Sequence, residues 1–387
     1  MNRLVKAIFA LVALACAACD NKLEYGTTPN TVIASLGTPL NNEIWFTTTD
    51  ALDLRNINET AFNVAIDDIL YSEMEHSVIR FAGPLTTIGE GAFSHCTNLH
   101  NISLPDSVTE IGEEAFFECT GMECMTFGNG LRRVNARAFD NCLALYTLHI
   151  PSIWCWCQIE FAGPTANPTY YSQTLILNGK KVISLELPDI VDGVKPYAFY
   201  NNTAITEVSV AASVKHFGTK AFEGCDNIRK VSVADIAAWC ATDFANETAN
   251  PLSIAGELHV NGNRVTSLSL EGITEVKSQA FINCTSLQSL TAEDITTIGT
   301  EAFRACSSLR NVLLGGGTKE LSGRAFMGCM ALKSVTIKAT TPPTLGDEYL
   351  FAYNAEGRMF YVPAESVDLY KNGALWEQYA DYIVAIE

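Results

Sequence analysis

Residues 298–314, IGTEAFRACSSLRNVLL, contain the pattern on which the fold of this chain depends. An Ala-Phe pair follows Ile-Gly, a cysteine lies three residues after Phe303, and apolar residues return at Leu309, Val312 and Leu314. The Ala-Phe pair recurs with its phenylalanine at Phe93, Phe116, Phe139, Phe199, Phe222, Phe281, Phe303 and Phe326. Five of the seven steps between them span about 22–23 residues, the length of one supersecondary unit that buries its apolar face only by stacking on copies of itself. The pattern therefore predicts a solenoid.

The two remaining steps, from Phe139 to Phe199 and from Phe222 to Phe281, each hold one repeat plus about 37 further residues. The added segments, 153–187 and 236–270, are duplicates that share Trp-Cys, Asn-Pro and Asn-Gly pairs at matching places. We call them the first and second long rungs, and the other repeats short rungs. In each long rung we expect a short helix and then a hairpin at Asn-Gly, a strong two-residue turn signal. The expected helices cover 153–160 and 236–243, and the hairpins 175–187 and 258–270.

Each short rung contains one apolar stretch that predicts a short strand. Such strands would stack in register into a parallel sheet with their apolar side chains inward. We expect the Ile-Gly-x-x-Ala-Phe segment to form a turn and about one helical turn, with the phenylalanine in the core. The expected strands cover 99–104, 122–127, 145–150, 205–210, 228–233, 287–292, 309–314 and 332–337.

The motif Ile-Gly-x-x-Ala-Phe-x-x-Cys-x-x-Leu-x-x-Ile/Val-x-Leu resembles the BspA-type, bacterial subclass of leucine-rich repeat. The Trp-Cys, Asn-Pro and Asn-Gly pairs of the long rungs are similar to a segment of such proteins, and the tail over 339–381 resembles their closing segment. The resemblance covers about residues 43–387. It implies an α/β repeat fold, a leucine-rich-repeat solenoid with a parallel sheet on the concave face. It also implies a surface protein, since such proteins are mostly known as surface adhesins or are uncharacterised.

The N-terminus has the pattern of an export signal. Arg3 and Lys6 precede an apolar stretch over 7–15 that is too short to span a bilayer. Ala17-Ala18-Cys19 resembles a bacterial lipoprotein cleavage box, with Cys19 as the lipid anchor and Cys16 as the rival residue; a plain secretory signal is the other alternative. We therefore expect a lipoprotein signal peptide (1–19), a flexible tether (20–41), the solenoid with its N-terminal cap (42–340) and a C-terminal cap (341–387).

Thirteen cysteines in an exported chain would ordinarily suggest disulfides. Seven of them lie three residues after the repeated phenylalanine, where Asn202 takes the place once. Side chains in register on stacked rungs point the same way and cannot adopt the dihedral angle of a disulfide. We therefore expect a row of buried thiols that hydrogen-bond the backbone. Cys155-Trp-Cys157 lacks a second pair at ligand spacing, so no metal site is predicted.

Composition and motifs give little support to catalysis. A net charge of −18, from 25 basic and 43 acidic residues, argues against nucleic acid and against electrostatic binding to anionic lipid. The six histidines belong to no metalloprotease motif, and the chain has no nucleophile elbow or phosphate loop. We expect neither an enzyme nor a cofactor. Trp154, Tyr170 and Tyr171 are candidates for a sugar-stacking surface, against the alternative that they pack in the core or on the hairpin.

The strand positions between the apolar ones should point out of the concave face and could form a recognition surface. Within it we expect an aromatic end and a basic end; the candidate ligand-binding residues are His100, Tyr146, His149, Arg229, Lys230 and Arg310. The predicted function is binding or adhesion to a protein ligand, with host proteins among the candidates, by an outer-membrane lipoprotein on the cell surface. The alternatives are a glycan-binding accessory protein, an exported enzyme with an unrecognised site, and a concave face that is merely solvated.

Overall fold

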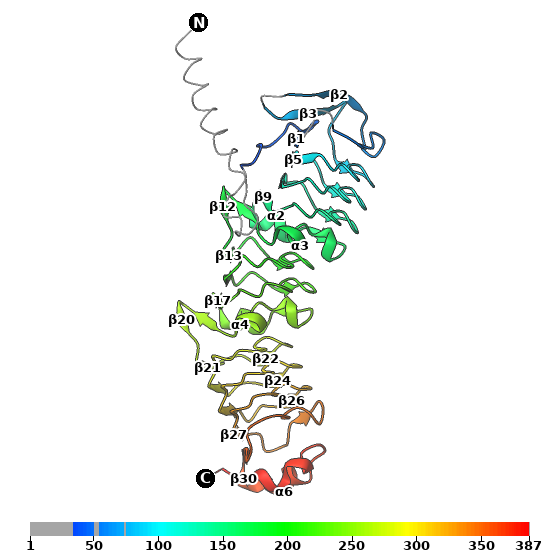
Figure 1. Ribbon diagram of the computed structural model, residues 1–387. Coiled ribbons are helices and arrows are strands. Elements are labelled where there is room, and N and C mark those ends of the chain that lie inside the picture. Colours follow the sequence, from blue (N-terminus) through cyan, green and yellow to red (C-terminus); the bar gives the residue numbers. More distant parts are fainter. Residues whose placement is uncertain (1–33, 50–53, 73–74, 387) are drawn as a thin grey trace. The chain divides into compact units, whose positions relative to one another are not determined.

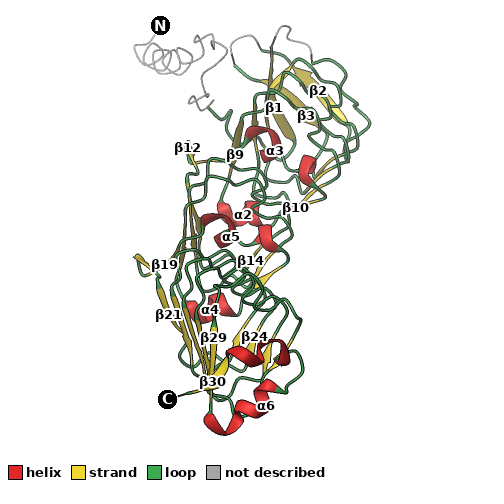
Figure 2. Ribbon diagram, turned by 60° about the horizontal axis from the view of Figure 1, so that its bottom comes forward, coloured by secondary structure: helices red, strands yellow, loops and turns green. Residues whose placement is uncertain are grey.

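The computed structural model describes residues 34–49, 54–72 and 75–386, which belong to one compact unit. The predicted signal peptide, its lipid-bearing Cys19 and the first part of the predicted tether lie outside the described residues. Stacked short strands dominate the described part, and helices are confined to the two long rungs and the C-terminal end (Figures 1 and 2).

The longer strands of the rungs form three sheets rather than the single sheet that was predicted. Neighbouring rungs pair in parallel and in register, for example Val208 with Val231. The first sheet has the order β12-β11-β9-β7-β5-β1-β3-β2, with strands β1 (Glu43–Thr48), β2 (Ile66–Leu70), β3 (Ser77–Phe81), β5 (Leu99–Ser103), β7 (Cys124–Thr126), β9 (Thr147–Ile150), β11 (Ile176–Leu177) and β12 (Lys180–Lys181). The second contains β13 (Ser184–Leu187), β15 (Glu207–Val210), β17 (Lys230–Val233), β19 (Leu258–Val260) and β20 (Asn263–Arg264). The third contains β21 (Ser267–Ser269), β23 (Ser289–Ala292), β25 (Asn311–Leu314), β27 (Ser334–Ile337), β29 (Met359–Val362) and β30 (Ile383–Ala385).

Each division falls at a long rung, because the hairpins β11–β12 and β19–β20 occupy the sheet edge on which the next rung would pair. The hairpins form at Asn-Gly as predicted, but they are shorter than expected. Residues 184–187 and 267–269 do not belong to them and instead begin the next sheet. In most short rungs the strand also begins two residues later than predicted, after the turn that follows the cysteine.

A second set of parallel sheets was not predicted. The Ile-Gly motif and its equivalents contribute two-residue strands that pair from rung to rung. They are β4 (Thr87–Ile88), β6 (Glu110–Ile111), β8 (Arg133–Val134) and β10 (Glu160–Phe161); β14 (Gly193–Val194), β16 (His216–Phe217) and β18 (Asp243–Phe244); and β22 (Glu275–Val276), β24 (Thr297–Ile298), β26 (Glu320–Leu321) and β28 (Thr344–Leu345). The glycine is required by close approach: a Cβ on Gly112 would lie 2.5 Å from the carbonyl carbon of Gly89 on the preceding rung.

The Ala-Phe segment forms consecutive turns and not the predicted helical turn. Glu114 and Glu118 have φ of 52° and 54°, a left-handed conformation that ends an α-helix before it can propagate. Hydrogen bonds run between rungs instead, as from the Phe116 N–H to the Ala138 carbonyl (2.8 Å). The phenylalanines are buried as expected. Their rings also stack between neighbouring short rungs, and those of Phe116 and Phe139 are 5.3 Å apart and nearly parallel. The stack continues beyond the predicted eight to Phe351, 5.6 Å from Phe326.

Both long rungs contain the same succession of short helices. The predicted helices are present but end three residues early, at Cys157 and Cys240, and the helices after the Asn-Pro pairs were not predicted. The elements are α2 (Ile153–Cys157), η1 (Pro164–Ala166) and α3 (Thr169–Ser172), and then α4 (Ile236–Cys240), η2 (Glu247–Ala249) and α5 (Leu252–Ala255). Ser152 and Asp235 accept backbone N–H groups of the first turn, so α2 and α4 begin at a capping side chain.

A tryptophan and an asparagine let each long rung join the regular stack. In a short rung the alanine carbonyl of the Ala-Phe pair accepts the phenylalanine N–H of the preceding rung, as Ala221 does from Phe199. After the first long rung, the Ala198 carbonyl instead accepts Trp156 Nε1 (2.6 Å) and Asn167 Nδ2 (3.0 Å). After the second long rung, the Ala280 carbonyl accepts the equivalent two donors, Trp239 Nε1 (2.8 Å) and Asn250 Nδ2 (3.3 Å). Both tryptophans are buried, so their role is structural.

The rung cysteines are buried and free, and most donate to the backbone as predicted. Cys119 Sγ lies 3.0 Å from the Phe93 carbonyl and Cys225 Sγ lies 2.9 Å from that of Phe199. Burial raises the pKa of Cys225 to about 12. Asn202 differs from the prediction: its side chain is fully buried, and neither polar atom of its amide has a hydrogen-bond partner in the described part of the chain. The rung cysteines Cys119 and Cys225 donate to the phenylalanine carbonyl of the preceding short rung. Asn202 has no such carbonyl as a partner, because the rung before it is a long one.

Caps of different construction close the two ends of this unit. At the N-terminal end, β1 pairs antiparallel with both β5 and β3, so the first sheet changes from parallel to antiparallel there. At the C-terminal end lie η3 (Ala364–Ser366), α6 (Val367–Lys371) and η4 (Glu377–Tyr382). Trp376 Nε1 donates to the Pro343 carbonyl (2.8 Å), and the Arg358 guanidinium lies 4.7 Å from the ring centre of Phe360. The Arg358 guanidinium also lies 5.1 Å from the ring centre of Phe351, and Trp376 lies 6.4 Å from it, so these two side chains cover the last phenylalanine of the stack.

Candidate functional site

The outward side chains of the three long-strand sheets form what we call the strand face, the surface predicted to be concave. Two side chains per strand point outward, and in the second and third sheets none of them is buried. Hydroxyl groups predominate among them. In the second sheet the two rows are Ser184, Glu207 and Lys230, and beside them Glu186, Ser209 and Ser232. In the third sheet they are Ser267, Ser289, Asn311 and Ser334, and beside them Ser269, Thr291, Leu313 and Thr336. Lys230 Nζ lies 3.1 Å from Glu207 Oε2, so these two charges are paired.

The strand face of the first sheet is covered by the chain itself. Ser35 Oγ hydrogen-bonds Thr126 Oγ1 (3.0 Å), and the Ser103 hydroxyl donates to the Gly37 carbonyl. Thr126 is 9% exposed and His149 is 8% exposed, whereas the equivalent positions of the other sheets are half-buried or exposed. Residues 34–41 fell at the end of the predicted tether, and in the structure they lie against the solenoid.

The six candidate ligand-binding residues are distributed over all three sheets. His100 on β5 and Tyr146 before β9 both approach Glu123, at 3.8 Å (Nε2) and 2.7 Å (Oη) respectively, while His149 on β9 is buried. Burial and the hydrogen bond to Glu123 raise the pKa of Tyr146, so its hydroxyl stays protonated and donates. The aromatic end of the predicted strip is thus engaged within the protein.

The predicted basic residues lie beyond the first sheet. Arg229 precedes β17 and is exposed, although its Nη1 donates to the Asp226 (2.6 Å) and Ile228 (2.9 Å) carbonyls. Lys230 on β17 pairs with Glu207. Arg310 precedes β25 on the third sheet and is exposed. A hairpin and the start of a new sheet separate Arg229 from Arg310, so the six residues do not form one continuous patch.

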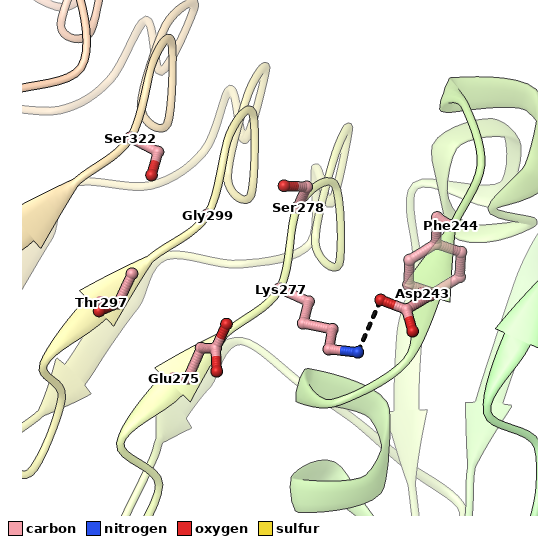
Figure 3. Close-up of a pocket in the computed structure, with 8 residues that line it drawn as sticks. All are labelled: Asp243, Phe244, Glu275, Lys277, Ser278, Thr297, Gly299 and Ser322. Carbon is pink, nitrogen blue, oxygen red and sulfur yellow. Dashed lines mark hydrogen bonds and ion pairs between the residues drawn. The ribbon is translucent and has the colours of Figure 1, made fainter.

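The structure adds hollows at two places that the sequence did not reveal. Each lies at a seam, our name for the place where a small sheet, built of the two-residue strands, stops at a long rung. At the second seam a hollow of about 310 Å³ is lined by Asp243, Phe244, Glu275, Lys277, Ser278, Thr297, Gly299 and Ser322. Lys277 Nζ reaches across it to Asp243 Oδ1 (2.6 Å), the contact drawn in Figure 3. The duplication in the sequence was a usable signal, because a lysine occurs at the same place after each long rung.

The first seam is larger and richer in charge. Its hollow of about 490 Å³ is lined by Thr109, Glu110, Arg132, Arg133, Gln158, Glu160 and Lys195. Lys195 Nζ lies 3.2 Å from Glu160 Oε1, the equivalent of the Lys277–Asp243 contact. The described residues that line these hollows include no cysteine and no histidine. In the described ranges no group of three or more His, Cys, Asp or Glu could hold a metal ion, and no helix is long and apolar enough to cross a membrane.

The three aromatic candidates of the first long rung have different surroundings. Trp154 lies beneath Arg132, with the guanidinium 5.5 Å from a ring centre. Tyr171 Oη donates to Asp140 Oδ1 (3.0 Å), and burial raises its pKa to about 12. Tyr170 is 38% exposed. Nothing in the sequence indicated that Tyr197 and Tyr200, which flank the buried Phe199, would lie beside them.

Known proteins with related structures are bacterial leucine-rich-repeat proteins. A leucine-rich cell surface protein of Faecalibacterium prausnitzii is 19% identical, with 79% of this chain and 83% of that one covered and a TM-score of 0.39. A leucine-rich repeat protein of Bacteroides ovatus is 16% identical over 90% and 99% of the two chains, with a TM-score of 0.34. The pneumococcal vaccine antigen PcpA is 16% identical over 76% and 67%, with a TM-score of 0.35. No curated protein matches the chain.

The family model agrees with the repeat seen in the sequence and in the structure. The model of the BspA type leucine rich repeat region matches in six copies, over residues 64–154, 169–250 and 252–358. These segments cover most of the chain and include both long rungs in part. The chain therefore belongs to the BspA-type leucine-rich-repeat family.

Proposed function

We propose that this protein is a binding or adhesion module that takes a protein ligand on the strand face of its second and third sheets. The observation that carries the proposal is the contrast in burial along that face. The chain's own residues cover Ser103, Thr126 and His149 in the first sheet, whereas no outward position of the second and third sheets is buried. A rigid surface whose side chains vary without disturbing the core suits recognition.

The chemistry of this surface favours a protein ligand. Hydroxyl and amide side chains on adjacent strands present donors and acceptors at regular spacing to a polypeptide backbone. Exposed Arg229 and Arg310 supply the residue type that often dominates binding energy at protein interfaces. His100, Tyr146 and His149 support the site less, because the first two contact Glu123 and the third is buried.

The test begins with a screen of the purified protein against extracellular-matrix proteins, followed by affinity measurements on variants. Changing both Arg229 and Arg310 to alanine should weaken binding of the captured protein by about tenfold or more, as expected when interface arginines are truncated. Arg324→Ala is the matched control, because Arg324 is half-exposed and pairs with Glu301 and Asp347 away from the strand face. Full affinity in the double variant would place the binding surface elsewhere.

We further propose that a lipid on Cys19 anchors the protein to the outer membrane at the cell surface. The support is the small-residue sequence before Cys19 and the membership in a family whose structural relatives include a cell surface protein. Acyl chains anchor by burying methylene groups, each worth about 0.8 kcal/mol. Cys19→Ser should release the protein from the membrane fraction or leave it unprocessed. Continued acylation at a different cysteine, above all Cys16, would overturn the assignment. Protease accessibility on intact cells tests the surface location.

A further inference from the structure

Four tyrosines of the first long rung and the following short rung gather away from the strand face. Tyr170 and Tyr171 lie on α3, and Tyr197 and Tyr200 lie in the turns on either side of Phe199. The ring centres of Tyr170 and Tyr171 are 4.9 Å apart, those of Tyr197 and Tyr200 are 5.9 Å apart, and Tyr170 and Tyr200 are nearly parallel at 6.1 Å. Figure 1 shows α3 on the side of these turns and the hairpin strand β12 on the opposite side.

The second long rung shows that the fold does not need this cluster. There the backbone carbonyl of Ser253 accepts Asn283 Nδ2 (2.9 Å), just as that of Tyr170 accepts Asn201 Nδ2 (2.9 Å). This shared hydrogen bond fixes the equivalence of the two places. By position, Ser253, Ile254, Gln279 and Ile282 stand where the four tyrosines stand in the first copy. The same backbone therefore forms without one aromatic side chain at these positions, so the tyrosines are available for another purpose.

The rim of the cluster is polar, and its charged side chains form ion pairs. Tyr171 Oη donates to Asp140, whose carboxylate also accepts from Arg137 Nε (3.3 Å). On the other side Glu223 pairs with Lys220 (3.1 Å). Arg137 also pairs with Glu114, so the rim offers hydrogen-bonding groups with no excess of positive charge. An acidic ligand would gain little from such a rim, while an uncharged ligand with many hydroxyl groups could form hydrogen bonds to it.

We propose that Tyr170, Tyr171, Tyr197 and Tyr200 form a second binding site, which takes a neutral oligosaccharide. A pyranose has an apolar C–H face that stacks on an aromatic ring and a hydroxyl edge that hydrogen-bonds carboxylates and amides. Exposed Tyr170 supplies the stacking ring, Tyr200 extends it, and Asp140 and Glu223 accept from sugar hydroxyls. This site is independent of the protein-binding function proposed for the strand face.

The test uses the full-length purified protein and an array of neutral and acidic oligosaccharides, with each hit measured by calorimetry. A neutral oligosaccharide of at least three sugar units should bind, and Tyr170→Ala should weaken it at least tenfold. Tyr170→Phe keeps the stacking ring and should retain affinity within about threefold, consistent with the size of stacking contributions. Tyr200→Ala is a second variant in case Tyr170→Ala alters folding. Tyr349→Ala, at an exposed tyrosine outside the cluster, should change nothing.

Several results would overturn the proposal: no binding of any neutral oligosaccharide at millimolar concentration, binding of acidic glycans alone, or undiminished affinity in both alanine variants. Capture of a protein whose binding requires Tyr170 would instead assign the cluster to a protein interface. The Arg229→Ala and Arg310→Ala double variant should bind the oligosaccharide normally. That control separates failure of this site from failure of the strand face.

Discussion

The two long rungs are built on one plan and differ in what they present to solvent. Trp156 and Asn167 in the first, and Trp239 and Asn250 in the second, donate to the same alanine carbonyl of the following rung. The tyrosine cluster beside the first rung has no aromatic counterpart at the equivalent described positions beside the second. The shared tryptophan and asparagine donate to a buried alanine carbonyl that loses its regular backbone donor where a long rung interrupts the short ones. The unshared residues are free to carry a function that belongs to one rung alone.

The largest expected effect comes from removing the tryptophans. Trp156→Ala and Trp239→Ala should each lower the free energy of unfolding by about 3–5 kcal/mol, because a large buried ring is lost and an interior carbonyl loses a donor. The two losses should be similar, since the two sites share the same contacts. Urea unfolding followed by circular dichroism measures them. In the control Trp156→Phe most of the ring remains and the donor is lost, so the cost should fall to about 1–3 kcal/mol. A cost below about 1 kcal/mol for either alanine variant would contradict the structural role.

The thiols of the short rungs that precede the long rungs predict sensitivity to alkali. Burial raises the pKa of Cys142 and Cys225 to about 12, above the ordinary value near 9. Between these values the unfolded chain has lost the proton and the folded chain retains it, so stability falls as pH rises from about 9 toward 12. Each such thiol contributes about 1.4 kcal/mol per pH unit in that window. Cys225→Ala should flatten the slope between pH 9 and 11 by that amount and leave it unchanged between pH 7 and 8. An identical slope above pH 9 would count against a protonated, buried thiol.

The turn after each long rung offers a gain of stability. Asn202 follows the first long rung with its buried amide unpartnered among the described residues, while Cys284 follows the second and lies 3.5 Å from Ser286 Oγ. A buried amide without hydrogen-bond partners lowers the free energy of unfolding by about 1–3 kcal/mol relative to a side chain without unsatisfied polar atoms. Asn202→Cys should therefore raise the free energy of unfolding by about 1–2 kcal/mol, measured by urea unfolding at pH 7. Cys284→Asn is the reciprocal control and should destabilise. A loss of stability in Asn202→Cys would mean that the amide is partnered after all.

Much of this comparison could be predicted from the sequence, because it depends on the regular spacing of the repeats. The Phe spacing predicted the stack, and the duplication of 153–187 in 236–270 predicted two equivalent long rungs with hairpins at Asn-Gly. Phe351 was missed because its distance from Phe326 is longer than the regular step and because Leu350 rather than alanine precedes it. The small sheets were missed because two residues per rung are too few to show an alternating pattern.

The candidate sites were harder to predict, since they depend on contacts between segments that no period relates. Nothing in the sequence of 34–41 indicates that Ser35 and Gly37 bond to β7 and β5 and cover the first strand face. Tyr197 and Tyr200 are single substitutions within a repeated turn, and only the structure brings them beside α3. The lysines of the seams were visible as a repeat, but their carboxylate partners come from the preceding long rung, far from them in sequence.

The smallest expected effect concerns those lysines. It tests whether exposed ion pairs or buried hydrogen-bond donors stabilise the contact between neighbouring rungs at a seam. Lys195–Glu160 and Lys277–Asp243 bridge the two seams, but each pair is substantially exposed, and exposed ion pairs contribute about 0.2–1 kcal/mol. Lys195→Met and Lys277→Met should therefore lower the free energy of unfolding by less than about 0.5 kcal/mol, and salt at about 0.5 M should erase the difference. Urea unfolding at low and high salt measures both. A loss of about 2 kcal/mol or more, well above the range of exposed ion pairs, would show that these pairs hold the rungs together. A negligible loss beside the large cost of Trp156→Ala would assign that task to the buried donors, which pair with a carbonyl that water cannot reach.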